Sequence, residues 1–429
     1  MRRSVLGALP ILLFALFVWL VNPVNARAAS GKIIYTFQGG ADGAYPYSDL
    51  AIDAAGNLYG TTSDGGVGCG GYGCGTVYEL LRTNNGWKHR VLYSFAGSSA
   101  RSFDGLDPEA GVVFDNSGNL YGTTVGGGRS GCGTLFRLAP NSHGAWSERV
   151  LYNFGCNSDG HNPKADLVFD NQGNLYGTTP AGGTGTGFCG GEWSGCGIVF
   201  KLSPNPDGSW TETTIYNFQG APDAAIPIGA LVPDGKGGFY GESQYGGSGT
   251  CNPGQGPLDP PNGCGAVFEL DPSAGGWTEN VIFSFFLGRG FARAPAGGLI
   301  VARPNLLFGT SSVGGNGLGT LLQLNDMGKG WNQSILHRFY EAEGRTPVGR
   351  LAEAPKDTWF GVTQGGGMNG SGTVFESTQA GLKERILFNF DRTAGSPAAG
   401  PTVDSRGHVY GTTPGSSNGN NGTVYEVIP

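Results

Sequence analysis

Apolar and polar residues alternate along this chain in short runs that are typical of β-strands. Residues 165–170, 174–179, 197–202 and 210–218 show the pattern well, with turn-forming residues such as Asn171-Gln172-Gly173 between the runs. Short turns join neighbouring strands that run in opposite directions. The pattern therefore predicts a four-stranded antiparallel meander in this stretch.

The same four runs recur seven times, and each copy is marked by an aromatic residue followed by glycine and a threonine-rich step. The marker glycines are spaced 50 to 68 residues apart: Gly60, Gly122, Gly177, Gly241, Gly309, Gly361 and Gly411. A recurring unit of this length indicates a repeat architecture, in which no unit buries its apolar surface alone.

A proline opens each copy: Pro46, Pro108, Pro163, Pro227, Pro295, Pro347 and Pro397. The second residue after each proline is small: Ser48, Ala110, Ala165, Gly229, Gly297, Gly349 and Ala399. Small side chains in a strand indicate that another backbone comes close, and sheets arranged radially are most crowded near their axis. The marker glycines are interpreted in the same way, one strand further out. The sequence thus predicts an all-β, seven-bladed β-propeller of four-stranded antiparallel blades.

The two ends of the chain are expected to share a blade. Residues 32–37 match the fourth run of a unit, whereas the chain ends on a third run at residues 422–427. We therefore expect the N-terminal strand to complete the last blade and close the ring.

The N-terminus has the pattern of a secretory signal peptide over residues 1–28, and residues 29–429 then form a single propeller domain. Arg2 and Arg3 precede an apolar run that ends near Val21, and Ala26-Arg27-Ala28 is a small-x-small cleavage pattern. An uncleaved membrane anchor is the alternative; Pro10 and the shortness of the run count against it. No second apolar stretch is long enough to span a bilayer, so no membrane span is expected after cleavage.

Composition excludes several classes of protein. The 81 glycines follow no Gly-X-Y period, which excludes collagen, and 11% aromatic residues are too many for a disordered chain. The formal charge is −7, and it becomes −10 without the leader because 23 basic residues then face 33 acidic ones. No basic run interrupts this acidity, so nucleic acid is not an expected partner. We expect a monomer.

Eight cysteines in an exported chain predict four disulfides. Cys74, Cys196 and Cys264 stand just before a third strand and have partners directly upstream in Cys69, Cys189 and Cys251. Cys132 has no such partner and is paired with Cys156, at the end of the following strand. A zinc site is the rival interpretation, but the cysteines fall on four different blades.

The order of turn, aromatic-glycine step and "GTVF"-like strand resembles the GloVer tandem repeat of bacterial "choice-of-anchor" proteins. All seven units match, those containing Gly309 and Gly361 least well. The resemblance implies an exported bacterial protein without an assigned reaction. Members often carry a C-terminal sorting segment, and this chain departs from that pattern because it stops at Pro429. The "D-x-x-G-N-x-Y" step is also similar to NHL-type propeller repeats.

Candidate ligand-binding residues lie in two sets of loops. The loops before each proline carry an acidic residue at five positions: Asp42, Asp104, Asp159, Asp223 and Glu343. If the ring closes, these carboxylates are expected around the mouth of the central channel, where they could orient sugar hydroxyls. No cofactor is predicted, although Ca²⁺ is possible at Asp42, Asp104, Asp159 and Asp223. The alternative is that each caps an Asp-Gly turn.

The Gly-rich loops add Tyr72 and Trp193 beside the disulfides, where each ring could stack on a sugar. The "D-x-x-G-N" turns at Asp53, Asp115 and Asp170, with degraded copies at Asp234 and Asp404, are interpreted as tight turns rather than calcium loops. Tryptophans before the outermost strands (Trp87, Trp146, Trp210, Trp277 and Trp331) are expected to cap blade edges.

No catalytic residue is assigned, because the five histidines are scattered and none forms a triad pattern. The leading hypothesis is a secreted, non-enzymatic propeller that binds extracellular glycan or protein on the bacterial exterior. An exported carbohydrate-active enzyme using carboxylates at the channel mouth is the alternative, and a purely structural envelope role is the third.

Overall fold

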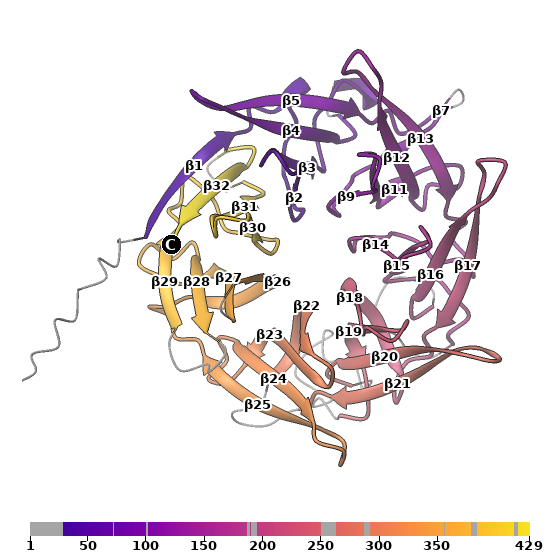
Figure 1. The fold of residues 1–429 in the computed structure, drawn as a ribbon, viewed down its shortest axis with the longest axis vertical. Helices are drawn as coiled ribbons and strands as arrows, with labels where there is room; N and C mark the ends of the chain where they lie inside the picture. The colour runs from indigo at the N-terminus through magenta and orange to yellow at the C-terminus, as the bar shows by residue number, and fades with distance from the viewer. Residues whose placement is uncertain are drawn as a thin grey trace, which may run out of the picture.

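The computed structural model is a closed ring of seven β-sheets around a central axis (Figure 1). It describes residues 29–71, 73–99, 102–186, 189, 195–249, 263–286, 292–355, 357–378, 384–415 and 419–429. The signal peptide expected at residues 1–28 lies outside these residues and stays a prediction. In the described part, helical structure is limited to the 3₁₀ turns η1 (Gly40–Asp42) and η2 (Cys69–Gly71), so none of it offers a helix able to span a membrane.

Each of the seven sheets has four antiparallel strands, which confirms the predicted propeller. Blades 1 to 3 are β2 (Ala51–Ile52), β3 (Leu58–Thr62), β4 (Thr76–Thr83), β5 (Gly86–Ser94); β9 (Val113–Phe114), β10 (Leu120–Thr124), β12 (Thr134–Pro140), β13 (Trp146–Asn153); and β14 (Val168–Phe169), β15 (Leu175–Thr179), β16 (Ile198–Pro204), β17 (Trp210–Asn217). Four short strands, β6 (Ser98–Ser99), β7 (Ser102–Phe103), β8 (Gly105–Leu106) and β11 (Gly126–Gly127), form two small ribbons.

Blades 4 to 6 have much longer inner strands than the others. They are β18 (Ala224–Pro233), β19 (Phe239–Gly246), β20 (Ala266–Ser273), β21 (Gly276–Ser284); β22 (Ala292–Arg303), β23 (Leu306–Gly314), β24 (Thr320–Asp326), β25 (Trp331–Arg338); and β26 (Arg345–Ala354), β27 (Thr358–Gly365), β28 (Thr373–Thr378), β29 (Glu384–Asn389). Blade 7 is β30 (Thr402–Val403), β31 (Val409–Thr413), β32 (Thr423–Ile428) and β1 (Ser30–Thr36).

The N-terminal strand closes the ring as predicted. β1 pairs antiparallel with β32, with Ser30 opposite Ile428 and Thr36 opposite Thr423, and Figure 1 shows the two strands side by side. The Phe37 N–H donates to the Gly422 carbonyl at 2.9 Å. The outermost strand of blade 7 is therefore supplied by the other end of the chain.

The apolar core is divided into seven clusters, one between each pair of neighbouring blades. The cluster between blades 7 and 1 contains Phe37 together with Leu50, Leu80 and Val424. The tryptophans expected to cap blade edges belong to these interfaces. Trp87 packs edge-on against Tyr410 at 5.8 Å, and Trp331 packs the same way against Tyr240, both across a blade boundary. Each blade is thus stabilised chiefly by its neighbours.

Six of the seven marker glycines make room for an aromatic ring rather than for another backbone, which corrects the expectation from sequence; at Gly309 the nearest side chain is that of Leu299. A Cβ on Gly177 would lie 2.6 Å from the ring of Phe200 on the next strand, and one on Gly361 would lie 2.3 Å from Phe375. At the inner strands the expectation holds, because a Cβ on Gly229 would lie 2.2 Å from the Gly297 carbonyl oxygen. The channel is therefore crowded by backbone and the blade interior by aromatic rings.

Three of the four expected disulfides are present among the described residues. Cys69 pairs with Cys74, Cys132 with Cys156 and Cys189 with Cys196, with Cα–Cα distances of 5.6, 5.3 and 5.0 Å. The fourth expected pair includes Cys251, which lies outside the described residues. Disulfides of this kind fit an oxidising compartment.

Candidate functional site

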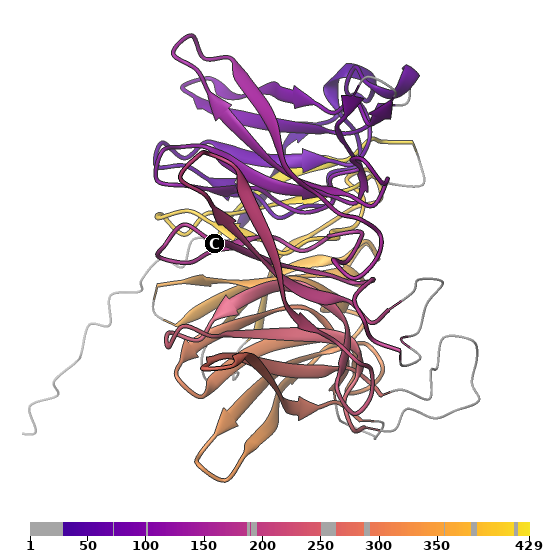
Figure 2. The same cartoon turned by 90° about the vertical axis from the view of Figure 1, so that its right-hand side faces the viewer.

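The antiparallel order of the strands assigns the connections to two faces of the ring. The loops from the fourth strand of one blade to the first of the next, and those from the second strand to the third, lie on one face, here called the loop face. The tight turns between first and second strands and the hairpins between third and fourth strands lie on the other, the turn face. Figure 2 shows the ring from its side, with connections at both faces.

A cavity of about 250 Å³ lies at the loop-face end of the central channel, and all seven blades line it with residues that follow the first residue of each unit, at or just before the inner strand. Its polar lining comes mainly from the first and third residues after the prolines that open the seven units. Tyr47, Glu109 and Lys164 stand one residue after a proline, and Asp166 and Arg350 stand three residues after one. Arg350 also lines a second cavity of about 430 Å³ at the turn-face end of blades 4 to 7.

Two aspartates and one arginine carry the charge at the deeper level of this cavity. Burial and the neighbouring Asp166 carboxylate raise the pKa of Asp49 to about 7, against the opposing effects of Arg350 and the Gly400 N–H. Burial also raises the pKa of Asp166, whose carboxylate accepts the Gly111 N–H at 2.6 Å. The pair can therefore hold and release a proton near neutral pH.

A second set of charges lies nearer the entrance. Lys164 forms an ion pair with Glu109 at 2.9 Å. Burial, with the Glu109 carboxylate next, raises the pKa of Asp107 to about 6. Tyr47 stands at the rim with 42% of its surface exposed. The cavity thus offers an aromatic edge, hydrogen-bond acceptors and one ion pair to a polar ligand.

The five acidic residues expected at the channel mouth do not line this cavity. Four of them accept a hydrogen bond from a tyrosine on the outermost strand of the preceding blade: Tyr35 to Asp42 at 2.6 Å, Tyr93 to Asp104 at 2.9 Å, Tyr152 to Asp159 at 2.8 Å and Tyr216 to Asp223 at 3.1 Å. Glu343 contacts His337 Nε2 at 3.0 Å in the same place. All four aspartates also accept the N–H of a nearby loop residue, as Asp159 does from Gly155. Their carboxylates therefore hold loops against outer strands, and ligand or calcium binding by them stays a prediction.

Three of these aspartates face a glutamate from the following blade. Burial and the Asp104 carboxylate raise the pKa of Glu148 to about 8, and burial and Asp223 raise that of Glu279 to about 8. Glu212 faces Asp159, and burial is the main cause that raises its pKa to about 7. Each pair therefore tends to hold one proton at neutral pH.

The remaining sequence-based expectations have mixed outcomes. Tyr72 and Trp193 lie outside the described residues. The "D-x-x-G-N" aspartates cap their own turns, since Asp53 accepts the N–H groups of Ala55 and Asn57 and the Asn57 side-chain amide at 2.8 to 2.9 Å. The same contacts recur at Asp115 and Asp170, as the turn interpretation predicts.

The charged residues of the cavity were missed although the sequence carries a signal for them. The third position after the proline is Gly or Ala in four units, but Asp49, Asp166 and Arg350 occupy it in the others. An aligned set of inner strands in which small residues alternate with three charges indicates a channel lining. The predicted acidic loop residues precede the proline of each unit, whereas the charged residues that line the cavity follow it.

The loop face also carries most of the exposed apolar side chains. Nine large apolar residues of the described chain are exposed, and eight belong to loop-face connections: Tyr45, Tyr47, Val67, Phe103, Leu106, Phe286, Tyr340 and Met368. The ninth, Met327, lies in a turn-face hairpin. Exposed apolar groups gathered on one face mark an interaction surface.

Another groove lies between blades 3 and 4 on the turn face, with a volume of about 500 Å³. Its rings already pack on one another, since the centroids of Tyr176 and Phe239 lie 4.6 Å apart and Trp277 stacks on Phe239 at 6.0 Å. These rings form the interface between the blades, and the channel cavity is the better candidate for a site.

Three solved structures show the level of similarity to known folds. A provisionally assigned 6-phosphogluconolactonase of Bacteroides uniformis has a TM-score of 0.46 and 12% identity, with 80% of this chain and 83% of that chain covered. A protein of unknown function from Dyadobacter fermentans has a TM-score of 0.48 and 9% identity over 94% and 99%. A gluconolactonase from Xanthomonas campestris has a TM-score of 0.40 and 12% identity over 93% and 89%. Similarities this low carry no argument about function.

A search of curated proteins finds no match to the sequence. A family model described as the Gloeobacter/Verrucomicrobia repeat matches residues 21–255 and 249–429, which together span all seven blades. The chain therefore belongs to the Gloeobacter/Verrucomicrobia repeat family, as the GloVer resemblance of its sequence predicts.

Proposed function

We propose that this protein is an exported, non-enzymatic binding module whose loop face engages extracellular glycan or protein. The gathering on that face of eight of the nine exposed large apolar side chains among the described residues carries the proposal, and one of the eight, Tyr47, lines the channel cavity. A rigid scaffold that presents loops on one face is a common platform for recognition. The three disulfides and the leader pattern support export to an oxidising compartment.

Two of the disulfides rigidify the loop face itself. Cys69–Cys74 and Cys189–Cys196 close short loops between second and third strands. Val67 lies beside the first of these and is exposed. Loops ordered before binding lose less conformational entropy when a ligand arrives.

The test compares two methionines on opposite faces. Met368 on the loop face is 85% exposed and Met327 on the turn face is 76% exposed. The labelled parent protein and three labelled variants are applied to a glycan array. The variants are Met368→Ser, Met327→Ser and Tyr47→Ala. We expect binding that Tyr47→Ala and Met368→Ser weaken and Met327→Ser leaves unchanged. Binding lost only with Met327→Ser contradicts the proposal, and silence of the array favours a protein ligand or a structural role.

The raised pKa of Asp49 supports a second candidate function, an exported glycoside hydrolase acting in the channel cavity. Such enzymes need one carboxylic acid that stays protonated near neutral pH and a second carboxylate nearby. Asp49 has a pKa of about 7 and Asp166 is the adjacent carboxylate.

A hydrolase screen separates the two functions on one protein sample. Turnover that Asp49→Asn and Asp166→Asn each abolish favours the enzyme in the channel. If Asp104→Asn or Asp159→Asn abolishes turnover instead, the carboxylates of the acidic loops carry the reaction. Glycan binding without turnover favours the binding module.

A further inference from the structure

Blade 4 departs from its neighbours where the turn between its first two strands meets its third strand. Asp234 of that turn, Glu269 and Asp271 of β20 bring one carboxylate oxygen each within 4.8 Å of one another. Asp234 is buried, with 3% of its surface exposed, and the other two are half-buried. Three carboxylates this close repel one another strongly unless one of them holds a proton or a cation lies among them.

One oxygen of this cluster has no hydrogen-bond partner. Asp234 Oδ1 accepts the N–H groups of Lys236 and Gly238 at 2.7 and 2.9 Å, as the turn requires. Asp234 Oδ2 is buried and accepts nothing. A buried carboxylate oxygen without a partner costs free energy that a bound ligand would recover.

The sequence of blade 4 explains why this oxygen has no partner. In blades 1 to 3 the turn ends in asparagine, and its side-chain amide donates to the second aspartate oxygen, as Asn57 does to Asp53 at 2.8 Å. Blade 4 has Gly238 at that position, so the donor is missing. Blade 4 also carries Asp271 where blade 3 has Ser203, and an acceptor is thereby added.

The charge of Glu269 also lacks the partner that its counterparts have. Three other blades have glutamate at this position of the third strand, and each pairs with a basic residue directly opposite: Glu79 with Arg90 at 2.5 Å, Glu376 with Arg385 at 2.6 Å and Glu426 with Lys32 at 3.0 Å. The residue opposite Glu269 is Asn280. The one basic side chain that acts on Glu269 electrostatically is Lys236 of the turn, as far as the described residues show.

We propose that Asp234, Glu269 and Asp271 form a binding site for Ca²⁺ on the turn face of blade 4. Three carboxylates supply hard oxygen ligands, and the partly exposed positions of Glu269 and Asp271 leave room for water to complete the coordination. The unpartnered Asp234 oxygen and the absent cross-strand cation are both accounted for by the bound ion. The site lies on the opposite face from the channel cavity and does not depend on the proposed function.

Calorimetric titration of the chelator-treated, dialysed protein with Ca²⁺ tests the site directly. We expect one ion per chain, with a Kd of about 10⁻⁴ to 10⁻³ M or tighter. Asp271→Ser introduces the residue that blade 3 tolerates at this position and should weaken binding by about tenfold or more. Glu376→Gln removes a glutamate at the same strand position in blade 6 and should leave Ca²⁺ affinity unchanged.

The melting temperature distinguishes a metal site from a merely structural carboxylate. In chelator, Asp271→Ser should melt at or above the parent because one repelling charge is gone; in millimolar Ca²⁺ it should melt below the parent. No binding heat and no Ca²⁺-dependent shift for the parent overturns the proposal. So does Asp271→Ser binding as tightly as the parent, or the parent binding Mg²⁺ in place of Ca²⁺.

Discussion

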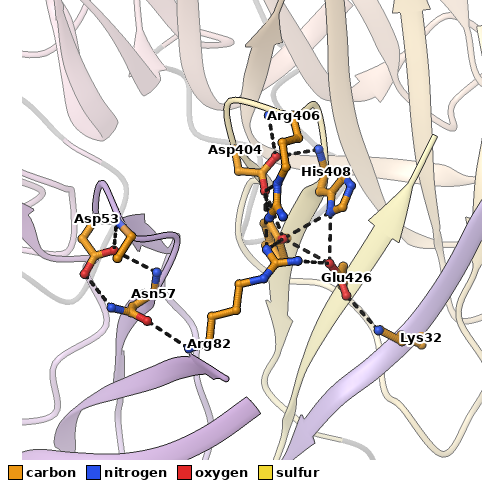
Figure 3. Close-up of polar contacts among 10 residues, drawn as sticks. Lys32, Asp53, Asn57, Arg82, Asp404, Arg406, His408 and Glu426 are labelled. Carbon is orange, nitrogen blue, oxygen red and sulfur yellow. Dashed lines mark hydrogen bonds and ion pairs between the residues drawn. The ribbon is translucent and has the colours of Figure 1, made fainter. Parts of the chain in front are cut away.

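The turn of blade 7 and the turn of blade 4 have both lost the asparagine of the repeat, and they respond differently. In blade 7, Asp404 Oδ2 accepts a hydrogen bond from Arg406 Nε at 3.0 Å (Figure 3). It also accepts one from the Tyr410 hydroxyl at 3.2 Å. In blade 4, the equivalent oxygen of Asp234 has no partner. The same loss is compensated by arginine in one blade, and in the other it leaves an oxygen free to bind a cation.

The glutamates beside these turns show the same contrast in their acidity. Although burial alone would raise it, the pKa of Glu426 is lowered, because Lys32 and His408 contact its carboxylate at 3.0 and 3.1 Å. Burial, with Asp271 also contributing, raises the pKa of Glu269. Position in the repeat therefore fixes where a side chain lies, and its neighbours decide which charge state is stable.

The first strand of the chain supplies Lys32, one of the cations that neutralise the carboxylates of blade 7. Removing that strand should therefore have the largest effect on stability. Deletion through Phe37 removes Lys32, the outermost strand and part of the apolar cluster between blades 7 and 1. We expect loss of the cooperative unfolding transition, because an exposed sheet edge and an open interface remain. The measurement is thermal unfolding followed by circular dichroism.

A chain that begins at residue 29 keeps the whole of β1, so it is the control for this deletion and should unfold in one cooperative transition. If the chain lacking residues up to Phe37 melted like the control, closure of the ring would contribute nothing to stability.

Replacing Arg82 removes a cation from the blade 7 carboxylates at the boundary between blades 7 and 1, and it leaves the ring closed. Arg82 of blade 1 reaches Asp404 at 3.8 Å and Glu426 at 3.9 Å in blade 7 (Figure 3). It also donates to the Tyr410 hydroxyl at 3.1 Å. Arg82→Met keeps much of the packing and leaves two buried carboxylates with one cation fewer. We expect a loss of about 1–3 kcal/mol in the free energy of unfolding, reduced from the fully buried case because Arg82 is partly exposed.

Denaturant unfolding measures this loss, with Arg293→Met on β22 of blade 5, away from the boundary between blades 7 and 1, as the control. A loss equal to that of the control would show that the carboxylates of blade 7 do not need Arg82.

Uncompensated carboxylates on the loop-face side predict a pH dependence of stability. The pKa of Glu148 rises from an ordinary 4.5 to about 8 through burial and Asp104. The folded state therefore holds a proton that the unfolded state has lost, so stability falls as pH rises from about 4.5 to 8. Glu148→Gln should flatten this fall and raise the free energy of unfolding at pH 8 by about 1–2 kcal/mol.

Unfolding free energies from pH 5 to 9 check this prediction. Glu353→Gln, which removes an exposed carboxylate, should keep the slope of the parent. An equal slope in the Glu148 variant and the parent would mean that this carboxyl is ionised in the folded protein throughout.

The sequence predicted the fold well because the fold depends on features repeated seven times. Glycines, prolines and small residues at fixed positions report crowding that every blade experiences, and the closing strand follows from where the units begin and end. The charged residues of the channel cavity and of the blade 4 cluster were not predicted, for the same reason. Asp49, Asp166 and Asp271 stand at positions where their unit differs from most of the others. Features shared by all seven units do not point to such positions. Whether Asp104 or Asp159 lines the channel depended on side-chain direction, which the loop sequence does not specify.

The smallest expected effect comes from giving blade 4 the basic residue that stands opposite the third-strand glutamate in blades 1, 6 and 7. This substitution also compares the blades most directly. Asn280→Arg places a guanidinium opposite Glu269, as Arg90 stands opposite Glu79. We expect the variant to be stabilised in chelator by about 0.5–1 kcal/mol, because a cross-strand ion pair replaces repulsion among carboxylates. It should also lose most of its Ca²⁺ affinity, because the arginine competes with the ion for the same oxygens. Calorimetry and unfolding in chelator measure the two effects on one sample, with Asn280→Gln as the uncharged control. Unchanged Ca²⁺ affinity in the arginine variant would show that Glu269 is not a ligand of the cation. The difference between the glutamates of blades 4 and 7 would then have no consequence for cation binding.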